Sequence, residues 1–130
     1  MKLPLLLSAA LLTAISAVPA VAQNQCMKSG GGPYTLEGQL GTGRFKDAAG
    51  RSETALILTL AKPVCMTGDE EEDRVKGSNK VHVFSGDENV HKRLQGLTGK
   101  QITVSGEPFG AHTAHHHAPI VFNATNVDTR

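Results

Sequence analysis

The chain has 130 residues, with 13 basic and 12 acidic side chains, six histidines and two cysteines. This length provides for one domain and excludes a second hydrophobic core. The balanced charge and the aromatic content of 4% argue against a nucleic-acid partner, because phosphate binding needs clustered positive charge and base stacking needs aromatic rings.

The first 22 residues have the pattern of a secretory signal peptide that is removed. Lys2 supplies a positive charge, residues 3–17 are largely apolar, and Ala20 and Ala22 are the small residues that a signal peptidase reads. The apolar run is shorter than the roughly 20 residues that span a bilayer, so we expect no stable membrane anchor. Cleavage after Ala22 would export the protein to the periplasm or the outside. Loss of Lys2 lowers the basic count from 13 to 12, which equals the acidic count.

Export would place Cys26 and Cys65 in an oxidising compartment, where an isolated pair of cysteines forms a disulfide. On the chain-entropy argument, such a bridge would stabilise the fold by roughly 3 to 4 kcal/mol. A redox or thiolate-metal site is the alternative, but the sequence has no Cys-x-x-Cys motif and no third thiol.

The first half of the mature chain predicts two strands after a flexible start. Residues 23–33 are polar and glycine-rich and predict a flexible segment ahead of a single domain over 34–128. Residues 34–45 predict a strand that glycines bend, and residues 53–66 predict a buried central strand that Pro63 ends. The acidic run Asp69–Asp73 then predicts a solvated loop, with a cation or partner site as the alternative.

The second half predicts a strand, a helix and a hairpin. Residues 80–84 alternate as a third strand, on which we expect His82 to be partly exposed rather than a ligand. Residues 86–99 predict the one helix, with Asp87 as its cap and with Val90, Leu94 and Leu97 on one face. Residues 101–122 then predict two strands that flank a histidine-rich tip.

The resulting order is strand, strand, strand, helix, strand, strand. This order is that of the OB-fold, a small five-stranded, partly open barrel, and we therefore expect an all-β fold with one helix. The alternative is a small α+β sheet with the helix on one face. The barrel is favoured because glycines interrupt the first strand and because no second helix is available to cover an open sheet.

Four of the six histidines lie at the tip of the predicted hairpin and suggest a transition-metal site. His115 and His117 are two apart and would face one side of an extended segment, and His112 would complete a set of three nitrogens for zinc, copper or nickel. His116 would face the other way and orient a neighbouring ring. Glu107 is the only carboxylate within sequence reach of the loop that could act as a general base beside a metal-bound water, and its position at the strand end suits a salt bridge or solvent equally well.

Other functions remain open at this point. The histidines would alternatively fill the mouth of the barrel, bonding to carbonyls and stacking on Pro119 or Phe109, or make the loop sensitive to acid. No serine-histidine-acid or thiol-based arrangement is specified, so we expect a protein that is not an enzyme. The competing class is a periplasmic protein-interaction module, of the inhibitor or immunity type, with an exported protein partner.

Several motifs together resemble a known family. They are residues 34–38, Pro63–Cys65, Leu97–Gly106 and, above all, the His-Thr-Ala-His-His-His-Ala-Pro run at His112–Pro119. This combination is similar to a family of small exported bacterial proteins known only as a domain of unknown function, over nearly the whole mature chain. The resemblance implies an exported single domain without an established activity. Ala118 departs from the threonine expected in the motif and removes a hydroxyl beside the histidines.

Overall fold

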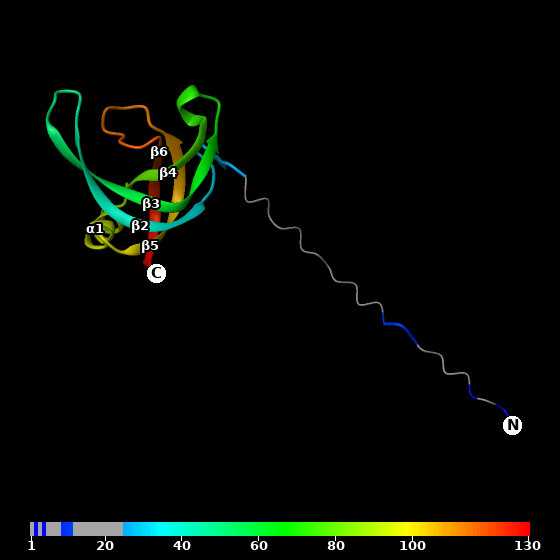
Figure 1. Ribbon diagram of the computed structural model, residues 1–130. Helices are drawn as coiled ribbons and strands as arrows, with labels where there is room; N and C mark the ends of the chain where they lie inside the picture. Colours follow the sequence, from blue (N-terminus) through cyan, green and yellow to red (C-terminus); the bar gives the residue numbers. More distant parts are fainter. Residues whose placement is uncertain (1, 3, 5–8, 12–24) are drawn as a thin grey trace.

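Residues 25–130 form six strands, one α-helix and one short 3-10 helix in a computed structural model of the protein (Figure 1). The structure describes residues 2, 4, 9–11 and 25–130, so the predicted signal peptide and residues 23–24 lie almost entirely outside the described residues. The elements are β1 (Met27–Lys28), β2 (Tyr34–Lys46), β3 (Ser52–Thr67), η1 (Glu71–Asp73), β4 (Val75–Phe84), α1 (Glu88–Gly96), β5 (Gln101–Gly110) and β6 (Ile120–Thr129). No helix of the described part is long and apolar enough to cross a membrane.

Five of the strands close into a barrel. The sheet order is β1-β3-β2-β5-β6-β4, and an additional pairing of β3 with β4 closes the ring. All ring pairs are antiparallel except the parallel pair of β4 and β6, and β1 adds a short parallel strand outside the ring. The prediction of a small OB-like barrel with one helix is confirmed, and the open α+β sheet is not what the chain forms.

The core follows from the alternation of side chains along these strands. Leu40 of β2, Leu58 of β3 and Ile102 of β5 are each 0% exposed. Gly38 supports the bend expected in the first strand, because a Cβ atom there would collide with the carbonyl of Thr59. The absence of a side chain at Gly38 therefore lets β2, which is the strand predicted to contain bending glycines, lie close against β3.

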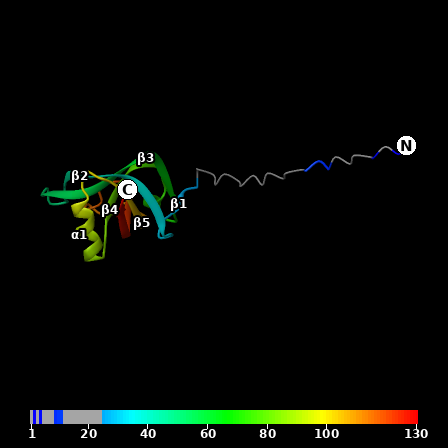
Figure 2. The same cartoon turned by 90° about the horizontal axis from the view of Figure 1, so that it is seen from below.

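Helix α1 is shorter than predicted but has the expected cap and apolar face. The Asp87 side chain accepts hydrogen bonds from the backbone N–H groups of Asn89 and Val90, at 2.9 and 3.2 Å. Leu94 is fully buried, and Val90 and Leu97 pack against the same core. The helix contacts β6 and lies at the lower left of the barrel in the views of Figures 1 and 2.

Two strand boundaries differ from the sequence prediction. The central strand passes through Pro63 to Thr67, and the third strand begins at Val75 instead of Lys80. The register of the β3–β4 pair shifts between Thr59 and Val64, so the missing N–H of Pro63 falls at an irregular position where no ladder hydrogen bond is needed. The predicted acidic loop is correspondingly shorter and contains η1.

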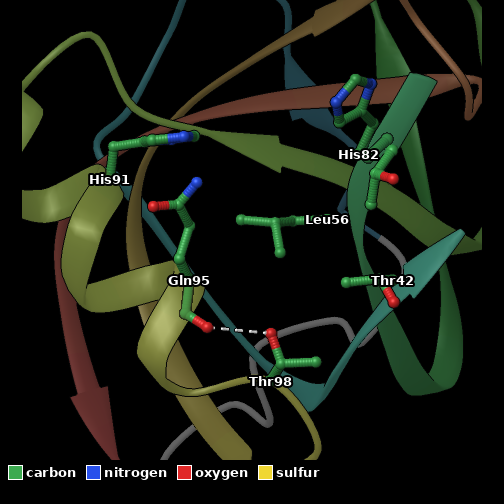
Figure 3. Close-up of a pocket in the computed structure, with 8 residues that line it drawn as sticks. Thr42, Leu56, His82, His91, Gln95 and Thr98 are labelled. Atoms are coloured by element: carbon green, nitrogen blue, oxygen red, sulfur yellow. Dashed lines mark hydrogen bonds between the residues drawn. The ribbon is translucent and has the colours of Figure 1, made fainter.

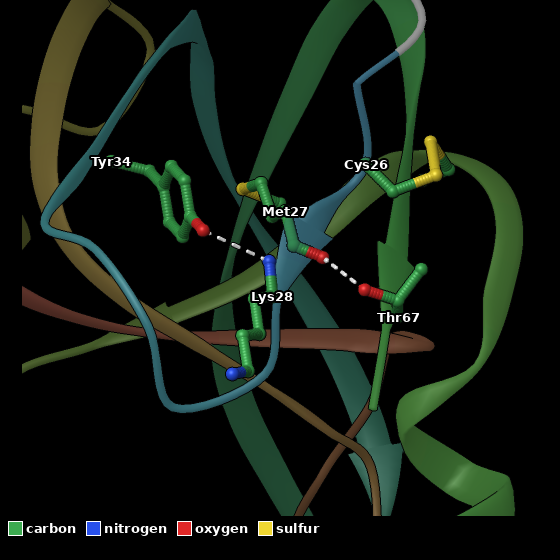
Figure 4. Close-up of a disulfide and its surroundings, with 6 residues drawn as sticks. Cys26, Met27, Lys28, Tyr34 and Thr67 are labelled. Carbon is green, nitrogen blue, oxygen red and sulfur yellow. Dashed lines mark hydrogen bonds between the residues drawn. A yellow bond between two sulfur atoms is a disulfide. The ribbon is translucent and has the colours of Figure 1, made fainter. Parts of the chain in front are cut away.

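The described part of the segment before β2, residues 25–33, is held against the barrel, whereas the sequence predicted a flexible start over residues 23–33. Met27 and Lys28 pair with the end of β3, and the hydroxyl of Tyr34 accepts a hydrogen bond from the Lys28 N–H at 3.0 Å (Figure 4). The predicted disulfide between Cys26 and Cys65 is present, with a Cα–Cα distance of 4.6 Å. The glycine-rich composition predicted flexibility. Composition does not show that Met27 and Lys28 pair with β3, a strand far away in the sequence.

Candidate functional site

The histidine loop, residues 111–119, is a compact turn between β5 and β6. Its ends are joined by a hydrogen bond from the Ala111 N–H to the Pro119 carbonyl at 3.2 Å. Inside it, the His116 N–H donates to the Thr113 carbonyl and the His115 N–H donates to the Thr113 hydroxyl. These bonds fix the backbone that carries the histidines.

The loop is also anchored to η1. The Asp73 carboxylate accepts a hydrogen bond from the Gly110 N–H at 2.9 Å, where β5 ends and the loop begins. A Cβ atom at Gly110 would collide with the backbone of Glu72, so only glycine lets η1 approach so closely. Asp73, one carboxylate of the acidic run, thus holds the start of the histidine loop in place, a role that the prediction of a solvated loop did not include.

The centre of the site is a carboxylate between two imidazoles. Glu53, near the start of β3, lies 2.7 Å from the His115 Nδ1 through Oε2 and contacts the His117 Nε2 through Oε1. Both rings act as donors to the carboxylate, which assigns their N–H groups to these two nitrogens. The hydrogen bonds from His117 and then His115 lower the pKa of Glu53, so its carboxylate is ionised at neutral pH.

The two histidines differ in how firmly they are held. The side chain of His117 is 8% exposed and that of His115 is 67% exposed. His117 stacks on the ring of Phe45, with centroids 4.3 Å apart and an interplanar angle of 6°. Phe45 and Glu53 are direct partners across the β2–β3 pair, so one face of this ribbon supplies both contacts to His117.

His116 and His112 form a second pair, whose rings make hydrogen bonds with the backbone of the loop and its start. The Nδ1 of His116 accepts the backbone N–H groups of His112 and Thr113, at 3.0 and 3.3 Å. The His112 Nδ1 lies 3.0 Å from the Gly110 carbonyl, and its ring lies edge-on to His116 with centroids 4.6 Å apart. Burial lowers the pKa of His116, and the positive charges of the neighbouring histidines lower it further.

His82 on β4 connects the loop to the barrel. Its Nδ1 accepts the backbone N–H of His117 at 3.2 Å. Burial, followed by the positive charges of His117 and His116, lowers the pKa of His82 to about 4, against the opposing charge of Glu53. His82 is therefore a neutral, half-buried acceptor at neutral pH, as expected of a partly exposed strand residue.

The structure brings two of the three predicted ligands together. His115 and His117 meet at Glu53, whereas His112 turns toward Gly110 and His116. Glu107 is exposed on β5, and no hydrogen bond or ion pair within residues 25–130 joins it to a histidine. In the same part of the chain, no three His, Cys, Asp or Glu side chains already have the spacing of a metal site.

Sequence reasoning missed Glu53 and Phe45 as parts of the site. Glu53 lies 62 and 64 positions before His115 and His117, Phe45 lies earlier still, and only the closure of the barrel brings both to the loop. The available signal was the lone carboxylate at the start of an otherwise apolar run, which marks an unusual place for a charge on a central strand.

The comparisons with known proteins agree with the resemblance expected from the sequence, over a shorter region. The resemblance was expected over nearly the whole mature chain, whereas the match begins within β4. No curated protein matches the chain. Residues 80–128, from β4 through α1 and the histidine loop to β6, match the family model of a domain of unknown function (DUF4431).

Proposed function

We propose that the protein is an exported, non-catalytic binding domain whose histidine loop takes zinc, copper or nickel through His115, His117 and Glu53. The observation that carries this proposal is the position of the Glu53 carboxylate between the His115 Nδ1 and the His117 Nε2. Two imidazoles and one carboxylate are a donor set that divalent first-row metals accept. The negative charge of Glu53 adds a favourable electrostatic contribution that three neutral imidazoles would lack.

The surroundings of the three donors support this proposal. His117 is held in place by Phe45 and by the hydrogen bond to His82, so little ordering remains to be done when a metal binds. Each ring nitrogen that binds the metal would give up its proton, either to solvent or to the other nitrogen of the same ring, and the exposed His115 ring can turn toward the metal. His116 fixes the backbone of the loop, because its Nδ1 accepts hydrogen bonds from the N–H groups of His112 and Thr113.

The non-catalytic part of the proposal is supported by the use of the polar groups around the loop. The ring nitrogens of His112, His116 and His82 that have partners bond to backbone groups, not to a nucleophile. Glu107, the carboxylate nearest in sequence, is exposed and apart from the histidines. These contacts organise a binding loop, and none of them pairs a side-chain nucleophile with a base, which is the arrangement that covalent catalysis uses.

The experiment is metal analysis of untagged residues 23–130 purified without chelator, followed by zinc, copper and nickel titration. We expect near-stoichiometric metal and a loss of affinity of at least about tenfold in Glu53→Gln and in the His115→Ala/His117→Ala double variant. Glu53→Gln keeps the shape of the side chain and removes its charge. His91→Ala on α1 is the matched control, since it also removes one imidazole, and its affinity should equal that of the wild type.

His112→Ala separates this ligand set from the one predicted by sequence spacing. An affinity within about twofold of wild type is expected, because the His112 ring turns to Gly110 rather than to Glu53. A loss as large as in His117→Ala would instead restore His112 as a ligand. Weak affinity that none of these variants changes would overturn the metal proposal.

A second candidate is a protein-interaction module for an exported partner, and the edge of β2 favours it. Within the described part of the chain, residues 41–46 of β2 pair with β3 on one side only. Such an edge offers backbone N–H and C=O groups to an added strand. A captured exported protein should then protect the amides of residues 41–46 from hydrogen exchange. Protection confined to the acidic run 69–73 would contradict the edge as the contact.

A further inference from the structure

A second site candidate is the pocket between α1 and the inner side of the β2–β3 ribbon. Its volume is about 270 Å³. His91 and Gln95 of α1, with Thr98 just after the helix, point toward it from one side, and Thr42, Leu56 and His82 line the other (Figure 3). The pocket is therefore built from four elements that only the closed barrel brings together.

Several polar groups that line this pocket have no hydrogen-bond partner among the described residues. The Thr98 hydroxyl donates to the backbone carbonyl of Gln95 at 3.1 Å, and the Gln95 side-chain amide points toward the pocket (Figure 3). The Nδ1 of His91 also has no partner among residues 25–130, but it is covered, so a ligand would meet the Gln95 amide and the hydroxyls of Thr42 and Thr54 first. These exposed groups can donate and accept hydrogen bonds to a bound molecule.

The rest of the lining is apolar or uncharged. Leu56 is 8% exposed and closes the floor of the pocket, beside which Thr42 and Thr54 lie. No Asp, Glu, Lys or Arg lines the pocket. A charged ligand would therefore be desolvated without a countercharge, which is costly, whereas a neutral ligand would not.

We propose that this pocket binds a neutral, hydroxyl-rich molecule of monosaccharide size. Hydroxyls donate and accept, so they match imidazole, amide and threonine groups of either polarity. The C–H face of a sugar ring would pack on the Leu56 side chain, which points into the pocket (Figure 3). The volume of about 270 Å³ accommodates one sugar ring.

This site is separate from the metal site and does not depend on it. None of the proposed metal ligands, Glu53, His115 or His117, lines the pocket. His82 is the one residue that touches both, since its Nδ1 accepts the His117 N–H while its ring lines the pocket. The two proposals can therefore fail separately, and the sugar experiment is carried out in the presence of chelator.

The test is NMR of ¹⁵N-labelled residues 23–130 with a panel of neutral probes at millimolar concentration: glucose, galactose, mannose, N-acetylglucosamine and ribose. We expect at least one sugar to shift the side-chain resonances of Gln95 and His91 in a saturable way. Glucuronate and glucose 6-phosphate, which carry charge on the same ring, should bind at least about tenfold more weakly.

Variants on the two walls connect the signal to the pocket. Gln95→Ala should weaken the affinity at least about fivefold by removing the amide, and Thr42→Leu should abolish binding by filling the space. Lys92→Ala on the solvent face of the same helix is the control and should bind as wild type does. Absence of saturable shifts for every neutral sugar overturns the proposal, as does equal binding in Thr42→Leu or a preference for the charged sugars.

Discussion

The two ends of β3 hold two different segments of the chain by different means. Near its start, Glu53 binds the histidine loop through two charge-assisted hydrogen bonds. Near its end, Cys65 binds the N-terminal segment through a disulfide, beside the pairing of Met27 with Met66. One strand therefore carries both a polar, reversible attachment and a covalent one.

The difference between these attachments indicates which end of the barrel is suited to binding. The covalent end is closed, because the sulfurs are consumed and the side chains of Met27 and Met66 are buried at 6% and 2% exposure. At the polar end the side chains of Glu53, His115 and His117 are joined only by hydrogen bonds, so their N and O atoms can become ligands of a cation. The proposed binding is thus located at the end of β3 whose attachment is reversible.

The largest expected effect comes from breaking the covalent attachment. The Cys26→Ala/Cys65→Ala double variant should lose about 3 to 4 kcal/mol of unfolding free energy. The two cysteines are 39 residues apart, and without the bond the unfolded chain gains the conformational freedom of this long loop. Urea unfolding under oxidising conditions measures this loss. Metal affinity at the other end of β3 should stay unchanged.

Tyr34→Phe is the matched control at this end. It removes only the hydroxyl that accepts the Lys28 N–H, so we expect a loss of about 1 kcal/mol or less. If the cysteine double variant lost no more than Tyr34→Phe, the N-terminal segment would be held by its strand pairing and not by the disulfide.

An intermediate effect is expected from acid acting on His82. Burial and the charges of His117 and His116, opposed by Glu53, lower the pKa of His82 from 6.5 to about 4. The unfolded chain therefore binds more protons than the folded one between these values, and stability from this group falls as the pH drops from about 6.5 to about 4. The full shift corresponds to about 3 kcal/mol, of which we expect roughly half because the ring is only half-buried.

The measurement is the unfolding free energy of the wild type and of His82→Asn across this pH range. Asparagine keeps an acceptor for the His117 N–H and does not titrate. The difference in stability between the two proteins should shift in favour of the variant as the pH falls. A difference that is constant with pH would show that the charge of His82 is not what limits the fold in acid.

The barrel could be predicted from the sequence because its signals are local. The alternation around Ile102 and Val104, the cap at Asp87 and the helical spacing of Leu94 each depend on a few neighbouring residues. The disulfide followed from arithmetic, since Cys26 and Cys65 are the only two cysteines. Pro63 misled the strand boundary because a bulge, which a single sequence does not reveal, accommodates it.

The site could be predicted only in part because its contacts are long-range. Spacing correctly grouped His115 and His117 on one side of the loop, as their shared contact with Glu53 shows. The same rule failed to place His112, because the loop is a hydrogen-bonded turn and not an extended strand. Glu53 lies 62 and 64 positions from its partners, a distance over which residue spacing carries no information.

The smallest expected effect on global stability comes from breaking the polar attachment. Glu53→Gln leaves the barrel core intact, so the unfolding free energy should change less than in the cysteine double variant. The loop should nonetheless open locally, because the rings of His115 and His117 lose their common acceptor. Hydrogen exchange at the His117 amide, which His82 now protects, should become faster.

Glu107→Gln tests whether this local effect belongs to Glu53. Glu107 is an exposed carboxylate on β5, the strand that leads into the same loop, so its neutralisation changes the net charge equally without touching a histidine. Exchange at His117 should remain at the wild-type rate in this variant. Equal acceleration in both variants would attribute the effect to net charge. The disulfide to the N-terminal segment would then be the one specific attachment of β3, and the contact of Glu53 with the histidine loop would not be one.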